Sequence, residues 1–222
     1  MLGYILSKLN LLILVTAIFA IIGFFAIGLA DITKVNEAKE LAFLINEKTF
    51  ALVSASAYCL SDSHIVSDDL SVAGGRFYYV ISISKEEVYI DGDTEPTNIV
   101  IFSVFPRDEI KRSVTDSGYT PKSIAAESFR TKAEVHLYSR IYNGTDYEGA
   151  FREHTGTLDE PVYIDPQAIT RGNGIEFIKE VELGKPKLYL IICNDAVCKA
   201  NKTEIGEQVH APLPSNEGGF KC

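Results

Sequence analysis

Four cysteines are the residues best placed to do chemistry in this 222-residue chain, and all four lie beyond residue 58. They are Cys59, Cys193, Cys198 and Cys222. An even count on one side of an apolar segment predicts two disulfides in an oxidising compartment, although four unrelated buried thiols would fit the same composition. Zinc is less favoured, because no second close cysteine pair completes a ligand set. Of the three possible pairings, we prefer Cys193–Cys198 across the NDAV turn together with Cys59–Cys222.

Two short motifs predict surface modification. Asn143-Gly144-Thr145 and Asn201-Lys202-Thr203 both match the N-x-[S/T] acceptor pattern for glycosylation. Each match alone is a weak signal. Together with paired cysteines, Asn143 and Asn201 favour an extracellular body in which both side chains are exposed.

A catalytic or cofactor-binding constellation is not predicted. The segment Asp91–Glu95, DGDTE, begins like a calcium loop. Its sixth position is then Pro96 rather than glycine, and its twelfth is Phe102 rather than glutamate, so an acidic turn is the better interpretation. No G-x-S-x-G elbow and no C-x-x-C motif occurs. We therefore expect no enzyme activity, no metal and no organic cofactor; the four histidines are scattered, at His64, His136, His154 and His210.

The charge balance limits the partners of the body. The formal net charge is -9, which disfavours nucleic acid and an anionic lipid surface as partners.

The elements that must position these residues begin with an apolar segment. Leu9–Ala30 holds 22 residues without a charge. As a helix it would cover about 33 Å, enough to cross a hydrocarbon core of about 30 Å. A signal peptide would have a shorter core and a small-residue cleavage site, and no Ala-x-Ala site follows directly here. The segment is therefore expected to be a retained anchor, with the N-terminus inside and the body outside.

The pattern beyond the span is amphipathic. Three- and four-residue steps place one set of residues on a single helical face: Val35, Ala38, Ala42, Ile45, Thr49 and Leu52. No helix breaker separates the two halves. We expect one helix from about Ile5 to about Ala55, on the order of 75 Å long.

The remainder predicts a β-rich body, so the fold class is α+β, a long N-terminal helix packed on an antiparallel sheet. The helical part covers residues 1–58 and the globular domain residues 59–222. We expect a hairpin over Arg76–Asp91 and strands at NIVIFSVF, AEVHLYSRIY and PVYID, with Val135, Leu137, Ser139 and Ile141 facing one way. IEFIKEVEL and KPKLYLIIC predict an antiparallel pair around Gly184. Asp108–Lys132 is undefined, and Asn143–Glu160 is interpreted as an exposed loop.

This architecture resembles a type IV pilin, with Leu9–Val53 as the specific part of the resemblance. In that family the apolar half-helices bundle into the core of a filament and the heads coat the outside. Archaeal surface filaments share this plan and commonly have glycosylated subunits, which suits Asn143 and Asn201. The resemblance implies a homo-oligomeric helical filament at the cell surface, anchored in the membrane before assembly. Its core would contain Leu12, Val15, Phe19, Ile22 and Ala26.

Two functions therefore stay open at the level of sequence. The first is a structural subunit of an extracellular filament. Its head could contact a surface receptor or a glycan. The alternative is a single-pass, membrane-anchored extracellular domain that binds a ligand or supports the envelope without polymerising.

Overall fold

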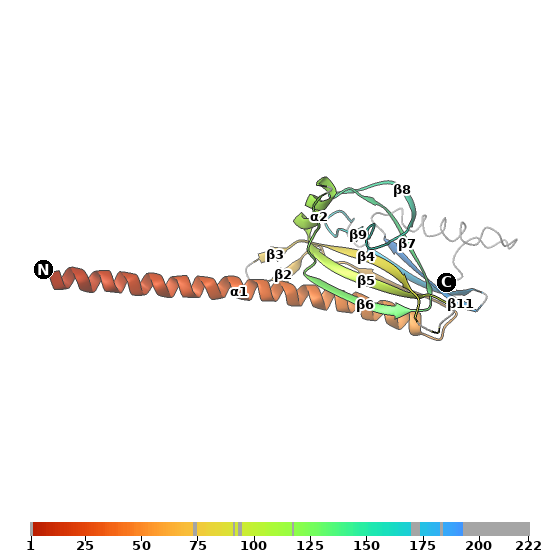
Figure 1. The fold of residues 1–222 in the computed structure, drawn as a ribbon, viewed down its shortest axis with the longest axis horizontal. Coiled ribbons are helices and arrows are strands. Elements are labelled where there is room, and N and C mark those ends of the chain that lie inside the picture. The colour runs from red at the N-terminus through yellow and green to blue at the C-terminus, as the bar shows by residue number, and fades with distance from the viewer. Residues whose placement is uncertain are drawn as a thin grey trace.

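The structure of the protein is a computed structural model that describes residues 2–72, 75–90, 92, 95–116, 118–169, 174–182 and 184–192, with side chains from residue 8 onward. It confirms the α+β class: one long helix extends from a β-rich body (Figure 1). The helices are α1 (Leu2–Ser54) and α2 (Arg107–Thr115). The strands are β1 (Cys59–Ile65), β2 (Leu70–Val72), β3 (Gly75–Phe77), β4 (Tyr79–Val88), β5 (Thr97–Pro106), β6 (Ala125–Thr131), β7 (Glu134–Tyr142), β8 (Tyr147–His154), β9 (Val162–Ile164), β10 (Gly174–Glu182) and β11 (Lys185–Ile192).

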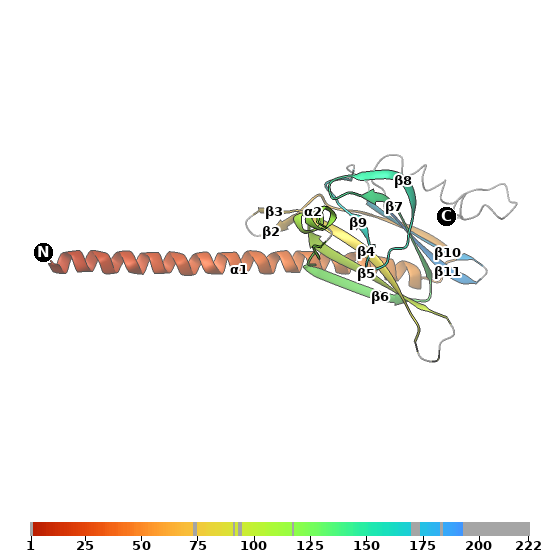
Figure 2. The same cartoon turned by 45° about the horizontal axis from the view of Figure 1, so that its top comes forward.

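Helix α1 runs without interruption over 53 residues, close to the predicted bounds. Proline is absent from it, and its last glycine is Gly28, so the backbone meets no strong helix breaker. The last turn closes where the Ala55 amide donates to the Ala51 carbonyl at 3.1 Å. The N-terminal half projects away from the body, whereas the C-terminal half lies along it (Figures 1 and 2).

Two main sheets form the body. One has five strands in the order β1-β10-β11-β7-β8, and the other has four in the order β6-β5-β4-β9. Strands β2 and β3 form a separate small pair. The pairs within these sheets are antiparallel except β11 with β7, which are parallel. The inner faces of both sheets and the C-terminal half of α1 contribute to one hydrophobic core.

The predicted hairpin over Arg76–Asp91 is wrong. Strand β3 pairs with β2, and β4 pairs instead with β5 in a register that places Ile83 opposite Phe102. The physical reason is the lack of a turn signal: Lys85 and Glu86 supply neither the positive φ nor the fixed φ that a tight turn needs. The chain therefore continues as one ten-residue strand to Val88.

Two further predictions on the body are corrected. The expected loop Asn143–Glu160 contains β8, an edge strand with mostly exposed residues whose polar composition hides its pairing with β7. Ile141 does not share the face of Val135, Leu137 and Ser139. A register shift between Ser139 and Ile141 changes the alternation, so Ser139 is 2 % exposed and Ile141 45 %.

The remaining predictions on strands hold well. Strands β5, β7 and β9 lie at the predicted segments, and β10 with β11 forms the predicted antiparallel pair. The segment left undefined, Asp108–Lys132, contains most of α2 and all of β6.

Candidate functional site

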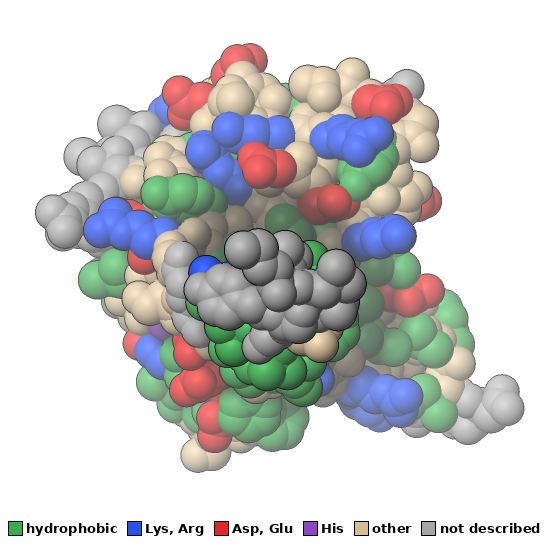
Figure 3. Space-filling model, turned by 90° about the vertical axis from the view of Figure 1, so that its left-hand side faces the viewer, with side chains coloured by type: hydrophobic (Ala, Val, Ile, Leu, Met, Phe, Trp, Pro, Cys, Tyr) green, Lys and Arg blue, Asp and Glu red, His purple; other side chains and the backbone are tan. Residues whose placement is uncertain are grey.

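The apolar half of α1 is the most distinctive surface of the molecule. Fourteen large apolar side chains between Leu9 and Leu29 are 41–76 % exposed. Soluble proteins rarely leave so large a contiguous apolar surface in water. Figure 3 looks onto the N-terminal side of the helix, where hydrophobic side chains of the projecting helix stand in front of a body surface of mixed charge. This surface needs a cover of lipid or protein.

The residues predicted for assembly all lie on this surface. Leu12, Phe19 and Ile22 are 64 %, 69 % and 57 % exposed, Val15 is 41 % exposed, and Ala26 is also exposed. Their spacing of three and four residues places them along one helical face. The structure thus leaves the predicted assembly face free of contact with the described body.

The polar groups within this half are compatible with an apolar surrounding. The Thr16 hydroxyl donates to the carbonyls of Leu12 and Ile13 at 3.0 and 2.9 Å. The Thr33 hydroxyl donates to the Leu29 carbonyl at 2.8 Å. A hydroxyl satisfied by its own helix adds little cost when the helix is buried in lipid or among helices. By length and composition, α1 is the one helix in the described part of the chain that could cross a membrane.

The C-terminal half of α1 is fixed to the body through the predicted stripe. Ala38, Ala42, Ile45, Thr49 and Leu52 are all buried in the shared core, as predicted, and Val35 is partly buried. The one polar member, Thr49, donates its hydroxyl to the Ile45 carbonyl at 2.7 Å. Packing of this stripe means that the body cannot rotate freely about the helix.

The end of α1 is secured by polar contacts as well. The Lys179 ammonium of β10 donates to the Ala55 carbonyl just beyond the helix. The Val181 amide, two residues beyond Lys179 on β10, donates to the Tyr58 carbonyl at 2.9 Å. The rings of Phe50 on α1 and Phe129 on β6 also meet edge to face, with centroids 6.1 Å apart. Helix and body therefore form one rigid unit from residue 38 onward.

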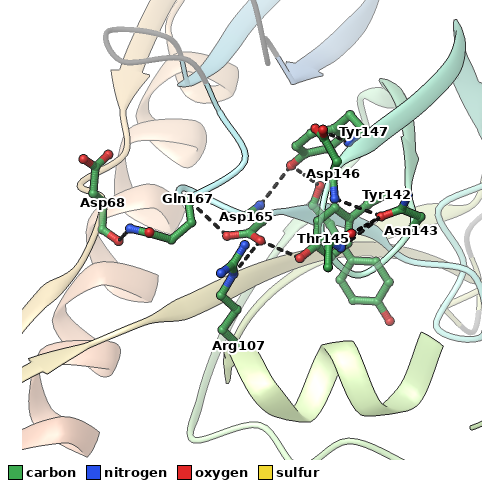
Figure 4. Close-up of polar contacts among 10 residues, drawn as sticks. Asp68, Arg107, Tyr142, Asn143, Thr145, Asp146, Tyr147, Asp165 and Gln167 are labelled. Atoms are coloured by element: carbon green, nitrogen blue, oxygen red, sulfur yellow. Dashed lines mark hydrogen bonds and ion pairs between the residues drawn. The ribbon is translucent and has the colours of Figure 1, made fainter. Parts of the chain in front are cut away.

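A buried polar cluster centred on Asp165 orders the end of the body that carries α2 (Figure 4). Asp165 is fully buried, and its Oδ2 accepts from Arg107 Nε at 2.7 Å and from the Tyr142 hydroxyl at 2.5 Å. Its Oδ1 accepts from the Gln167 amide at 3.0 Å, and its own amide donates to the Tyr147 hydroxyl at 2.9 Å. Every polar atom of this carboxylate has a partner, which compensates the cost of burying a charge.

The electrostatics of the cluster favour a structural role. Burial raises the pKa of Tyr142, and the hydrogen bond to Asp165 raises it further. Burial alone would lower the pKa of Arg107, but the hydrogen bond and the charge of Asp165 outweigh it and raise that pKa. Tyr142 therefore stays protonated and Arg107 stays charged near neutral pH, so neither is poised to exchange a proton with a substrate. The cluster joins α2, β7, β8 and the segment after β9. Sequence reasoning missed it because its members are far apart in the chain.

The other candidate residues for chemistry do not converge. Among the residues that the structure describes, no three histidine, cysteine, aspartate or glutamate side chains could hold a metal ion together. Asp91 and Asp93 of the acidic turn lie outside the described residues, while Glu95 pairs with Lys185 at 3.0 Å. His136 Nδ1 lies 2.6 Å from Glu153 and its ring stacks on Tyr189, which is a contact within the sheet.

The predicted modification sites are only partly described. Asn143 is partly exposed at the turn between β7 and β8, where its Oδ1 accepts from the Thr145 amide and hydroxyl at 3.0 and 2.9 Å. Its amide nitrogen, the atom that a glycan would join, donates to Glu148. Asn201 lies outside the described residues. Glycosylation of either site stays a prediction.

Of the four cysteines in the predicted disulfides, only Cys59 is among the described residues. Cys59 begins β1 and is not a free thiol. Cys193, Cys198 and Cys222 lie outside the described residues, so the preferred pairing stays a prediction.

Comparison with known proteins does not add a family. No protein-family model, no curated protein and no solved structure matches this chain. The features that point to a function are therefore α1 itself and the way in which the body is attached to it.

Proposed function

We propose that this chain is the structural subunit of an extracellular, pilus-like filament, assembled through Leu9–Ala30 with the β-rich body on the outside. One observation carries the proposal: a single helix has a fully exposed apolar half and a second half that is packed rigidly into the body. An apolar surface of that size needs lipid or other helices around it.

The rigid attachment favours copies of the same chain over lipid alone as the final cover. A repeating subunit must hold its body at a fixed angle to the helix, because each contact is repeated along the assembly. Contacts between different patches on identical subunits that do not close on themselves generate a helical filament. An anchored receptor has no such requirement, and a flexible linker after the span would serve it equally well.

The alternative is a single-pass anchor for a body that does not polymerise. The length of the apolar half supports it, since about 33 Å of helix matches a bilayer core of about 30 Å. Both functions place the same segment in lipid at some stage, so they differ in what surrounds it in the end state.

Electron microscopy of the purified full-length chain after detergent removal tests the proposal. We expect filaments of constant diameter with a regular axial repeat. Discrete particles that contain one or two chains and need detergent or lipid to stay dispersed would support the anchor instead.

A further inference from the structure

A small apolar cavity lies at the end of the four-stranded sheet where β4 ends and β5 begins. Its volume is about 60 Å³, and five side chains line it, namely Val88, Ile90, Thr97, Ile99 and Arg130. We call these five residues the β4–β5 cup. The ends of β4 and β5 that form it lie on the side of the body away from the N-terminal half of α1 (Figures 1 and 2). The cup is therefore separate from the surface proposed for assembly.

The register of the sheet places the cup on the face opposite the core. Val88 of β4 is opposite Thr97 of β5. Ile99, two residues along β5, is opposite Arg130 of β6. Opposed residues on neighbouring strands, and residues two apart on one strand, point to the same side of a sheet. Val100 points the other way and joins the hydrophobic core, so the cup is built on the outer face of three adjacent strands.

Thr97 gives the cup a polar group that lacks a partner. The residue is 5 % exposed, and among the described residues its hydroxyl has no hydrogen-bond partner. A buried hydroxyl without a partner costs free energy, so native proteins rarely keep one unless a ligand or an ordered water completes it. A buried water makes about three hydrogen bonds. Three of the five side chains around the cup are aliphatic, so a water held there would have few partners.

Arg130 adds a cation to the same cup. Within the described part of the chain, its guanidinium takes part in no hydrogen bond and no ion pair. Thr97 and Arg130 are diagonal neighbours on β5 and β6, at a Cα separation of about 7–8 Å that a long side chain can span. Arginine can only donate hydrogen bonds. A group that satisfies both Arg130 and the Thr97 hydroxyl is therefore an acceptor, and a carboxylate matches the guanidinium best.

We propose that the β4–β5 cup binds a short aliphatic carboxylate. The hydrocarbon part of the ligand lies against Val88, Ile90 and Ile99, where it is removed from water. Its carboxylate oxygens accept from the Thr97 hydroxyl and the Arg130 guanidinium.

The volume of the cup limits the size of the ligand. About 60 Å³ is the liquid volume of about two waters, so only a few carbon atoms fit. Because so few atoms are enclosed, we expect a dissociation constant of about 1 mM. Of the five lining residues only Arg130 is charged. Glu86, which is opposite Ile99 on the same face, is two strand spacings or about 10 Å from Arg130 across the sheet and does not line the cup.

Methyl NMR of the full-length chain in a non-ionic detergent tests the site. Sodium butyrate is added to about 50 mM at constant ionic strength, well above the expected dissociation constant. We expect saturable shifts of the Val88, Ile90 and Ile99 methyl signals, whereas the signals of Ile83 in the core stay in place. Butylammonium has the same hydrocarbon chain with the opposite charge and should cause no saturable shift. No saturable shift with butyrate, or an equal one with butylammonium, would overturn the proposal.

Two substitutions test the polar contacts. Thr97→Val keeps the shape of the side chain and replaces the hydroxyl with a methyl group, and Arg130→Gln removes the charge from an exposed position. Each should raise the dissociation constant for butyrate about tenfold, because each removes a hydrogen bond to a charged group. Ser128→Ala changes the same face of β6 two residues before Arg130 and should leave the constant unchanged. Unchanged binding in either of the first two variants would overturn the proposal.

A carboxylate side chain of a second copy is the rival occupant of the cup. The butyrate titration does not depend on assembly, so its result is independent of the proposed filament. We expect the Arg130→Gln chain to form the same assemblies as the unmodified chain in electron micrographs, since the cup is away from the apolar half of α1. Loss of those assemblies, together with no butyrate binding by the unmodified chain, would assign the cup to a contact between copies and overturn the proposal.

Discussion

The two halves of α1 use the same backbone for opposite purposes. From Leu9 to Leu29 every side chain is exposed, and apolar residues surround the helix on all sides. From Ala38 to Leu52 a single stripe is buried in the body, while charged residues such as Glu40 and Glu47 remain exposed. The first half cannot be stable in water without a partner, whereas the second already has one. Continuity of the helix transmits the position of the body to the apolar half.

The largest expected effect is a charge in the apolar half. Phe19→Asp places an unpaired carboxylate on the predicted assembly face, at a cost of several kcal/mol per copy in an apolar surrounding. We expect filaments to disappear in electron micrographs while the circular dichroism of the body is unchanged. Asn36→Asp adds the same charge at an exposed position of α1 outside the apolar half and should assemble normally. Filaments of normal length from the Phe19→Asp variant would show that the apolar half of α1 is not the assembly surface.

A smaller effect is expected in the polar cluster that orders the body. Arg107→Ala leaves the buried Asp165 carboxylate without its cation and should lower the free energy of unfolding by about 3–5 kcal/mol. Arg76→Ala removes an exposed pair with Asp69, at 3.5 Å, and should cost about 0–1 kcal/mol. Urea unfolding followed by tyrosine fluorescence measures both. Similar losses in the two variants would show that the buried cluster has no special role.

The next prediction concerns the buried stripe on the C-terminal half of α1. Ile45→Ala removes a fully buried side chain between helix and sheets, and we expect a loss of about 2–4 kcal/mol in the same assay. Phe43→Ala changes a residue that is 53 % exposed on the same helix and should shift stability by less than about 0.5 kcal/mol. If the Phe43 change were the more costly one, the assignment of the buried face would be wrong.

The smallest effect concerns pH. Burial lowers the pKa of His64 below 6.5, Lys48 lowers it further and Asp62 partly opposes them. The unfolded chain therefore binds more protons at this residue, so stability rises with pH through the range just below 6.5 and is constant above it. His64→Gln should flatten that part of the profile when unfolding is measured between about pH 5 and about pH 8. An unchanged slope would mean that other groups determine it.

Sequence was most informative where one period persists over many residues. The stripe from Val35 to Leu52 could be predicted because a single face recurs over several turns, and the strands β10 and β11 because a turn glycine separates two apolar runs. Strand β8 could not be predicted, since an edge strand with exposed faces has the composition of a loop. The displaced Ile141 depends on a bulge, and the parallel pairing of β11 with β7 depends on partners distant in the chain. The Asp165 cluster joins residues 58 positions apart, a contact that no local pattern encodes.

Photo-crosslinking from within the apolar half tests the central claim most directly. A benzoyl-phenylalanine in place of Phe19 preserves an aromatic side chain and reacts with whatever lies beside it in intact cells or in purified assemblies. We predict a ladder of chain-to-chain products under ultraviolet light, and no such ladder when the probe replaces the exposed Tyr58 of the body. Products that contain only lipid joined to single chains would contradict assembly through this helix and leave it as an anchor.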